Sequence, residues 1–165
     1  MGQSLPIISI ESFSTSTAGS ANYQNDASDL YAALSEIGFA IIVGHGVDEA
    51  IITNMRNAVK TVFDAPREIL KQDMVVKGNY RGFVPLGYFT PNSGNGAADH
   101  YEAWKLHNET DPGNPVCTAC SLYGPNKWPN ISFDVRTPIM AYWNALTKVS
   151  ERLIIALCNQ LGVDQ

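Results

Sequence analysis

The last third of this sequence carries an apolar stripe that constrains everything the chain can fold into. From about residue 133 to residue 161, large apolar side chains recur at the spacing of one helix face, which predicts a single long helix. The stripe is formed by Ile139, Tyr142, Trp143, Leu146, Val149, Leu153, Ile154 and Leu157. A stripe this wide must be buried, and the other elements of the chain can cover only part of it.

The first forty residues predict one strand and one helix. Residues 7–10 form a short apolar run after Pro6, which indicates a strand. Residues 14–28 are rich in Ser, Thr, Ala and Gly and are expected to form a loop, with Asp26 or Ser28 capping the helix that follows. That helix should end at Gly38. Its apolar face is formed by Leu30, Ala33, Leu34 and Ile37.

The next segment predicts a buried strand and two helices. Residues 39–43 are continuously apolar and bounded by glycines, which favours a buried strand, and residues 44–46 (Gly-His-Gly) make the turn after it. Asp48 should open a second helix, where its charge suits the helix dipole. Pro66 should open a short third helix, because the N–H that proline lacks has no partner at the first helical position. The apolar side of the second helix is formed by Ile51, Ile52, Met55, Val59 and Phe63.

Residues 78–128 are rich in Gly, Pro and Asn, with strand-like pieces at 80–84 and 103–106 and an expected mobile loop at 92–98. No internal repeat occurs, and no linker divides the chain into two cores, so we expect one domain over residues 1–165. The mixture of helices and scattered strands predicts an α+β layer that packs against a larger sheet.

Composition excludes several classes of function. The chain has 165 residues, enough for one domain with a hydrophobic core. Its net charge of −5 gives no footprint for nucleic acid and disfavours an anionic membrane surface. The N-terminus has no basic and apolar signal sequence, and the longest apolar run, at 39–43, is too short to span a bilayer. We therefore expect a cytoplasmic protein.

Candidate metal ligands are few. Cys117 and Cys120 have the spacing of half a zinc site, but no second pair lies at a suitable interval, and an odd count of three cysteines indicates free thiols. His100 and Glu102 could converge on one side of a strand, whereas His107 would face away from them. His45 fits a turn or a hydrogen-bonded structural role better than a metal site. The sequence therefore predicts no metal ligand and no catalytic residue.

Six segments occur in an informative order. They are LPIISIESF at 5–13, LYAALSEIGFAIIVGHGVDEAII at 30–52, VFDAPREILK at 62–71, NYRGFVPLGYF at 79–89, DHYEAWKL at 99–106 and YWNALTKVSERLIIAL at 142–157. Together they resemble the N-terminal region of the iron(II)/2-oxoglutarate-dependent dioxygenases, in the branch that includes isopenicillin N synthase.

The resemblance implies a fold and a function. It implies a helix-rich region with a few strands that buttresses a double-stranded β-helix (jelly-roll) core, the core itself being largely absent from this chain. The complete enzyme would bind Fe(II) and 2-oxoglutarate and oxidise a small organic substrate by abstracting hydrogen. This chain lacks the family's later His-x-Asp and distant His, so it should be inactive alone. Its partner would be the missing C-terminal catalytic core or an equivalent surface.

The same resemblance directs attention to residues 79–89, which in the family often line the mouth of the active site. We expect Tyr80, Arg81, Phe83 and Tyr88 to contact substrate. Arg81 could pair with a substrate carboxylate, and the tyrosines could supply flat contact area with a polar tip. In the other interpretation, these aromatic residues pack under the helices and Arg81 is a solvated or structural charge. An alternative function is a non-catalytic interaction module that retains only the supporting part of the fold.

The first prediction concerns iron. Anaerobic titration of the chain with iron(II) should reveal no stoichiometric tight site, because His107 would face away from His100 and Glu102 in the expected strand. A one-to-one site that disappears in His100→Ala would contradict this expectation.

Overall fold

The computed structural model describes residues 4–90, 96, 98–120 and 122–163 and separates into two compact units. The first unit comprises Met1–Asn54 and Met140–Gln165, and the second comprises Met55–Ile139. Each unit has its own core cluster, and the apolar residues of the middle segment pack mainly on one another. The expected loop at 92–98 lies largely outside the described residues.

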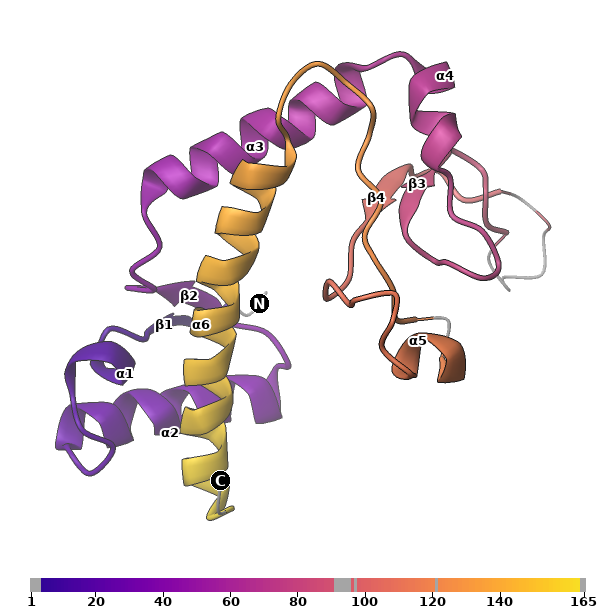
Figure 1. Cartoon of the computed structure of the whole chain (residues 1–165). Helices are drawn as coiled ribbons and strands as arrows, with labels where there is room; N and C mark the ends of the chain where they lie inside the picture. The colour runs from indigo at the N-terminus through magenta and orange to yellow at the C-terminus, as the bar shows by residue number, and fades with distance from the viewer. Residues whose placement is uncertain (1–3, 91–95, 97, 121, 164–165) are drawn as a thin grey trace. The chain divides into compact units, whose positions relative to one another are not determined.

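The first unit is built on two parallel strands. β1 (Ile7–Ser9) pairs with β2 (Ile41–Val43) in the register Ile7↔Ile41, Ile8↔Ile42 and Ser9↔Val43. The helices of this unit are α1 (Ser12–Thr15), α2 (Ala21–Glu36), the first residues of α3 (Glu49–Asp64) and most of α6 (Arg136–Leu161). The strand expected at 7–10, the helix end at Gly38 and the long final helix are thus confirmed (Figure 1).

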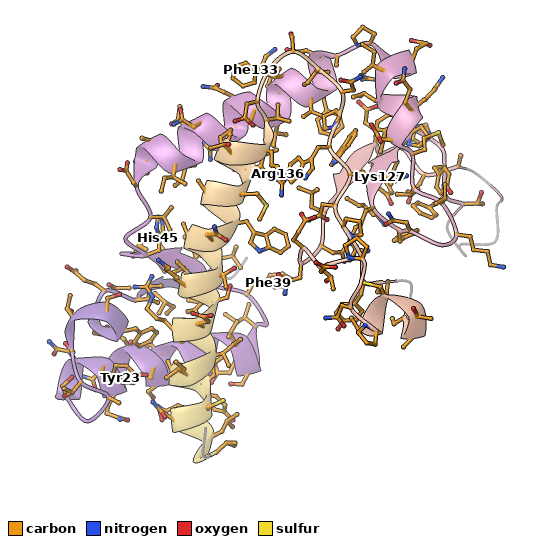
Figure 2. The ribbon with its side chains drawn as sticks, in the orientation of Figure 1. Tyr23, Phe39, His45, Lys127, Phe133 and Arg136 are labelled. Carbon is orange, nitrogen blue, oxygen red and sulfur yellow. The ribbon has the colours of Figure 1, made fainter. Side chains whose placement is uncertain are left out.

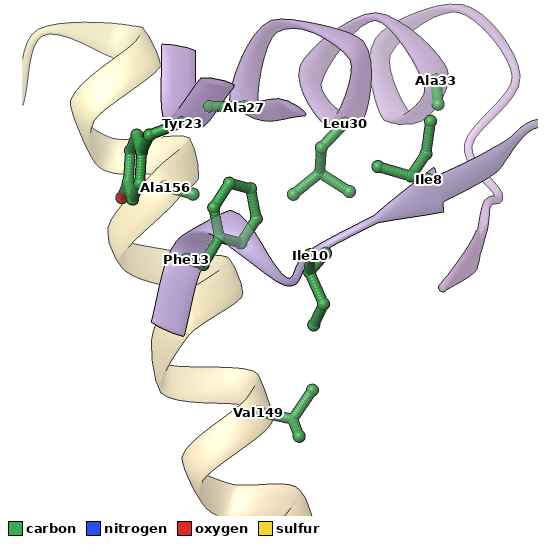
Figure 3. Packing of buried hydrophobic residues seen from close by; sticks show 9 residues of the cluster. All are labelled: Ile8, Ile10, Phe13, Tyr23, Ala27, Leu30, Ala33, Val149 and Ala156. Carbon is green, nitrogen blue, oxygen red and sulfur yellow. The ribbon is translucent and has the colours of Figure 1, made fainter. Parts of the chain in front are cut away.

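Alternate residues of β1 enter the first core, where α2 and α6 meet it. Ile8 lies against α2 near Ala33, and Phe13 lies with Tyr23 and Ala156 (Figure 3). The Phe13 and Tyr23 ring centroids are 5.0 Å apart. The buried members are Ile8, Ile10, Phe13, Tyr23, Ala27, Leu30, Ala33, Val149 and Ala156. Residues 8–13 and α2 therefore share one core with part of the apolar stripe of α6.

α2 begins well before either of its expected caps. The hydroxyl of Ser20 accepts a hydrogen bond from the Tyr23 N–H at 3.4 Å, so the cap is Ser20 rather than Asp26 or Ser28. Much of the expected loop at 14–28 is therefore helical. Asp26 instead accepts a hydrogen bond from the hydroxyl of Ser12. The polar composition of residues 14–28 indicated a loop, because Tyr23 is the one large buried side chain in the first turn of α2.

β2 is less buried than its apolar sequence predicted. Ile41 and Val43 are 46% and 42% exposed, and the neighbouring Phe39 is 69% exposed. Only the opposite face, with Ile42, packs against the core. On β1, Ile7 is 67% exposed on the same side as Ile41. The two strands thus present an uncovered apolar face within the first unit.

In its described residues, the second unit contains the rest of α3, the first residues of α6, three short helices and a two-stranded ribbon. After Pro66 come α4 (Arg67–Leu70) and the 3-10 turn η1 (Lys71–Asp73), which confirms the short helix expected there. β3 (Gly82–Val84) pairs antiparallel with β4 (Ala103–Lys105), and α5 (Val116–Ala119) follows. The core of this unit holds Ala58, Val62, Leu70, Phe83 and Val135.

Among the described glycines of this unit, Gly82 has the closest backbone neighbour. Its φ is +105°, and a Cβ at this position would overlap the carbonyl oxygen of Asp73 and lie 3.1 Å from the Cδ atom of Lys127. Only glycine combines this backbone conformation with so close an approach. The glycine therefore allows β3 to lie directly against η1.

Two of the long helices, α3 and α6, start at acidic side chains. The Asp48 carboxylate accepts from the Ala50 N–H at 2.8 Å, which confirms Asp48 as the start of α3. The Asp134 carboxylate accepts from the Thr137 N–H at 3.1 Å, so α6 begins at Arg136 rather than near residue 133. Hydrogen bonds from Thr137 lower the pKa of Asp134 below its usual 3.8. Within the described part of the chain, no helix is long and apolar enough to cross a bilayer.

We predict that Gly82→Ala destabilises the protein by at least about 2 kcal/mol, because the new methyl group meets a backbone carbonyl and the positive φ strains any other residue. Gly78 is the matched control, since a Cβ there meets nothing within 4 Å. Gly78→Ala should leave the free energy of unfolding unchanged or raise it by up to about 1 kcal/mol. Urea denaturation of both variants measures the difference; equal effects would contradict the close approach at Gly82.

Candidate functional site

The predicted substrate-contacting residues surround β3 but do not share one environment. Phe83 pairs with Trp104 of β4, is 0% exposed and lies in the second core. Tyr80 is half-buried, and Tyr88 is 41% exposed. Tyr80 and Tyr88 are brought together through Phe89, whose ring centroid lies 5.9 Å and 4.8 Å from theirs. The tyrosines have surface left for a ligand, whereas Phe83 supports the strand from beneath.

Arg81 is buried, so it is not the solvated charge that one of the two interpretations allowed. It is 1% exposed, and its Nη2 donates a hydrogen bond to the carbonyl of Leu122. Its Nε and Nη1 atoms have no hydrogen-bond partner among the described residues. A buried guanidinium with one hydrogen bond to the described residues is costly, because its hydration has been removed without full replacement. Arg81 therefore places a strong, poorly compensated positive charge next to β3.

Lys105 is the neighbour that the sequence interpretation missed. Its Nζ lies 4.0 Å from the ring centroid of Tyr80 and 5.0 Å from that of Phe89. These are cation–π distances. Alternation along residues 103–107 places Lys105 and His107 on the side opposite Trp104, which packs in the core. That alternation was the available signal for including both residues in the site.

Asn126 holds the end of the ribbon in place. Its Oδ1 accepts from the His107 N–H at 3.0 Å, and its Nδ2 donates to the His107 carbonyl at 2.8 Å. The same Nδ2 donates to a carboxylate oxygen of Glu109 at 3.0 Å. Satisfying both backbone groups of His107 extends the ordered strand beyond the end of β4. The position of the imidazole is thereby set by a side chain nineteen positions further along the chain.

A cavity of about 270 Å³ opens beside this strand end and is lined by Arg81, His107, Asn108, Leu122 and Tyr123. Apart from Leu122, these residues carry polar side chains: a guanidinium, an imidazole, an amide and a phenol. Leu122 and Tyr123 are exposed and form its outer side, whereas Arg81 is buried. The cavity is small compared with a complete drug-sized ligand site and suits one polar end of a small molecule.

Burial lowers the pKa of His107 below its usual 6.5, and the nearby charges of Arg81 and Lys105 lower it further. A hydrogen bond with the Tyr80 backbone acts in the opposite direction without cancelling these effects. The imidazole is therefore neutral at pH 7, with one nitrogen able to donate and one able to accept.

The residues considered for iron do not form a ligand set. The Glu102 carboxylate pairs with Arg67, with 2.6 Å between Oε1 and Nη2. In the described part of the chain, no three His, Cys, Asp or Glu side chains are grouped as a metal site requires. An iron(II) oxygenase needs two histidines and one carboxylate around the metal. The described residues do not meet that requirement.

The other candidates have structural surroundings. The Nδ1 of His45 accepts from the Val47 N–H at 3.0 Å, and its carbonyl accepts from Arg152 at 2.8 Å, which confirms the hydrogen-bonded structural role. Cys117 and Cys120 are free and half-buried at the short helix α5. The Sγ of Cys117 donates to the carbonyl of Asp111 at 3.4 Å.

Comparison with known proteins identifies the family. Residues 5–131 match the family model described as the N-terminal region of non-haem dioxygenases of morphine synthesis. This match covers most of the chain, and the chain belongs to that family. The expected resemblance to the 2-oxoglutarate-dependent dioxygenases is thereby confirmed.

Two of the relatives that match this chain are named as dioxygenases. The chain is 29% identical to validamycin A dioxygenase of Streptomyces hygroscopicus subsp. limoneus, over 99% of this chain and 45% of that protein. It is 27% identical to a 2-oxoglutarate-dependent dioxygenase of Trichoderma harzianum, over 96% of this chain and 48% of that protein. The chain thus spans about half the length of these curated relatives.

Solved structures give the same picture of the fold. A 2OG-Fe(II) oxygenase family protein from Caulobacter crescentus matches with a TM-score of 0.79 at 23% identity, over 99% of this chain and 50% of that chain. A full-length protein from Neurospora crassa, solved in complex with alpha-KG, matches with a TM-score of 0.77 at 16% identity, over 97% of this chain and 48% of that chain. The α+β arrangement is therefore that of one half of an oxygenase chain.

The pKa of His107 predicts a pH dependence of stability. Because the folded-state pKa lies below 6.5, the unfolded chain takes up this proton first as the pH falls. Stability is therefore lost as the pH drops through about 6.5 towards the folded pKa, and His107→Gln should reduce that loss between about pH 7 and pH 5. Denaturation at several pH values measures it. His100→Gln serves as the matched control, and an identical pH profile in wild type and His107→Gln would contradict the assignment.

Proposed function

We propose that this chain is the N-terminal portion of an iron(II)/2-oxoglutarate-dependent oxygenase that oxidises a small organic substrate by hydrogen abstraction. Within that enzyme it forms the substrate side of the active site. Family membership supports the reaction class. The observation that supports the role of this portion is the aromatic and cationic surface of Tyr80, Tyr88, Phe89 and Lys105 beside a polar cavity.

In this proposal the four predicted residues have different tasks. Tyr80 and Tyr88 contact the substrate, because both keep accessible ring surface with a hydroxyl at its edge. Arg81 acts through its charge at the cavity, and Phe83 positions the strand from the core. Fe(II) and 2-oxoglutarate belong to the complete enzyme and supply its oxidising chemistry. The donors for iron would come from the remaining polypeptide, since the described residues of this chain do not provide them.

The remaining catalytic core is also the proposed partner of the first unit. The face of β1 and β2 that carries Ile7, Ile41 and Val43 is apolar and uncovered, and an uncovered apolar face of a small sheet favours packing against further structure. A small-molecule substrate, rather than nucleic acid or a membrane, suits the net charge of −5. We place the protein in the cytoplasm, where its three free thiols stay reduced.

The test of the proposed function is turnover by the complete polypeptide. With iron(II), oxygen and a substrate library, it should release succinate from 2-oxoglutarate in a substrate-dependent manner. The intact mass of the natural protein, together with a His-x-Asp sequence beyond residue 165, distinguishes the enzyme from a non-catalytic interaction module. If the natural polypeptide ends near residue 165 and binds another protein, the non-catalytic interaction module would be favoured.

We predict that Tyr88→Ala in the complete enzyme lowers kcat/KM by about tenfold, because truncating a contacting aromatic ring removes roughly 1.5 kcal/mol of binding. Tyr31 in α2 is equally exposed, at 41%, and provides the matched control. Tyr31→Ala should leave kcat/KM unchanged. If the two substitutions had the same effect on steady-state kinetics, Tyr88 would not be a substrate contact.

A further inference from the structure

Three basic side chains converge around Gly82. Arg81 precedes it, and Lys105 is its partner in the β3–β4 register. The Cδ atom of Lys127 lies 3.1 Å from the position that a Cβ on Gly82 would occupy. Lys127 is labelled in Figure 2. An overall acidic chain therefore concentrates positive charge at one end of a short ribbon.

None of these three cations has a carboxylate partner within 4.0 Å among the described residues. Arg81 donates to the Leu122 carbonyl, and Lys127 donates to the Met74 carbonyl at 2.7 Å. Lys105 lies over the rings of Tyr80 and Phe89. Carbonyl oxygens and ring faces carry partial charges only, so the positive charge remains largely uncompensated.

Two other arginines of the same unit do have acidic neighbours. Arg67 pairs with Glu102, and Arg136 lies 4.0 Å from Glu109. The basic side chains around Gly82 differ from them, because buried Arg81 has no such neighbour within the part of the chain that the structure describes. Burying Arg81 without a counter-ion is unfavourable, and an anion bound next to it would recover part of that cost.

The adjoining cavity has the donors that a carboxylate requires. Arg81 lines it from the buried side, and two of its nitrogens lack a partner among the described residues. Asn108 and Tyr123 line the rest and can donate from an amide and a phenol. His107 also lines it, but its imidazole is hydrogen-bonded to the Tyr80 backbone and has no second donor while it is neutral. Planar guanidinium groups bind carboxylates through parallel hydrogen bonds, which favours a carboxylate.

We propose that the cavity lined by Arg81, His107, Asn108 and Tyr123 is a carboxylate subsite, and that the substrate of the oxygenase carries a carboxylate which binds there. Lys105 forms its cationic rim, and the rings of Tyr80 and Phe89 receive the adjoining carbon atoms of the substrate. This inference rests on the proposed function for the identity of the ligand as substrate, but the anion site itself does not.

The binding test uses acetate as the probe, with acetamide as its uncharged counterpart, and follows the His107 imidazole of the 165-residue chain by NMR. Acetate should give a saturable shift and raise the His107 pKa, because a bound negative charge favours the imidazolium. Acetamide should do neither. Lys105→Met should weaken acetate binding about tenfold, whereas Lys77→Met, which removes an exposed lysine of the same unit, should not. Arg81→Gln should abolish binding; Tyr123→Phe, an exposed position, tests the site if Arg81→Gln fails to fold.

Several outcomes would overturn the inference. They are the absence of a saturable acetate effect, an equal response to acetamide, or equal weakening by Lys77→Met and Lys105→Met. A second arm repeats the titration in the complete polypeptide. If acetate no longer binds there, an Asp or Glu of the remaining chain occupies the cavity, and the substrate assignment is wrong.

Kinetics separate this inference from the proposed function. An active oxygenase that processes an acid and its uncharged amide with equal kcat/KM would overturn the carboxylate subsite and leave the oxygenase proposal intact. If the complete polypeptide is inactive but its His107 still reports acetate binding, the oxygenase proposal is overturned. The anion site then remains, with another ligand.

Discussion

The close approach of Gly82 to the backbone of Asp73 sets the geometry of the whole second unit. Because a side chain at residue 82 would overlap the Asp73 carbonyl, β3 can lie directly against η1 only with glycine at this position. That contact directs Phe83 into the core, where it meets Leu70 and Trp104. Arg81, the residue before Gly82, is buried as well and lines the polar cavity with His107. The apolar and the charged surroundings of the ribbon therefore meet next to one backbone contact.

The two sides of the ribbon have opposite physical characters. On one side, Phe83 and Trp104 pack with a ring-centroid distance of 6.4 Å and anchor the strands by burial of apolar surface. Lys105 and His107 lie on the other side, next to buried Arg81. The lowered pKa of His107 keeps its imidazole neutral at pH 7. A rigid apolar support beneath a charged surface is the arrangement that preorganises polar recognition, because the charges do not have to be moved into place when a ligand binds.

Particular residues show where the sequence interpretation succeeded and where it did not. Gly38, Asp48 and Pro66 marked helix ends correctly, because their backbone and capping properties act locally. The predicted cap of α2 was wrong. The actual cap, Ser20, precedes a polar stretch, and only the burial of Tyr23 and Ala27 reveals the packed face of this helix. The burial of Arg81 was also missed, because it depends on Leu122, forty-one residues away.

The sequence by itself determined the family, the α+β class and the order of the elements, because apolar periodicity, caps and glycines act over a few residues and six ordered segments identify the relatives. Only the tertiary structure decided the division into two cores, the uncovered face of β1 and β2, and the meeting of Arg81, Lys105 and Lys127 at Gly82. These features arise from contacts between distant segments, and side-chain burial and unpaired charge are properties of those contacts rather than of any local pattern.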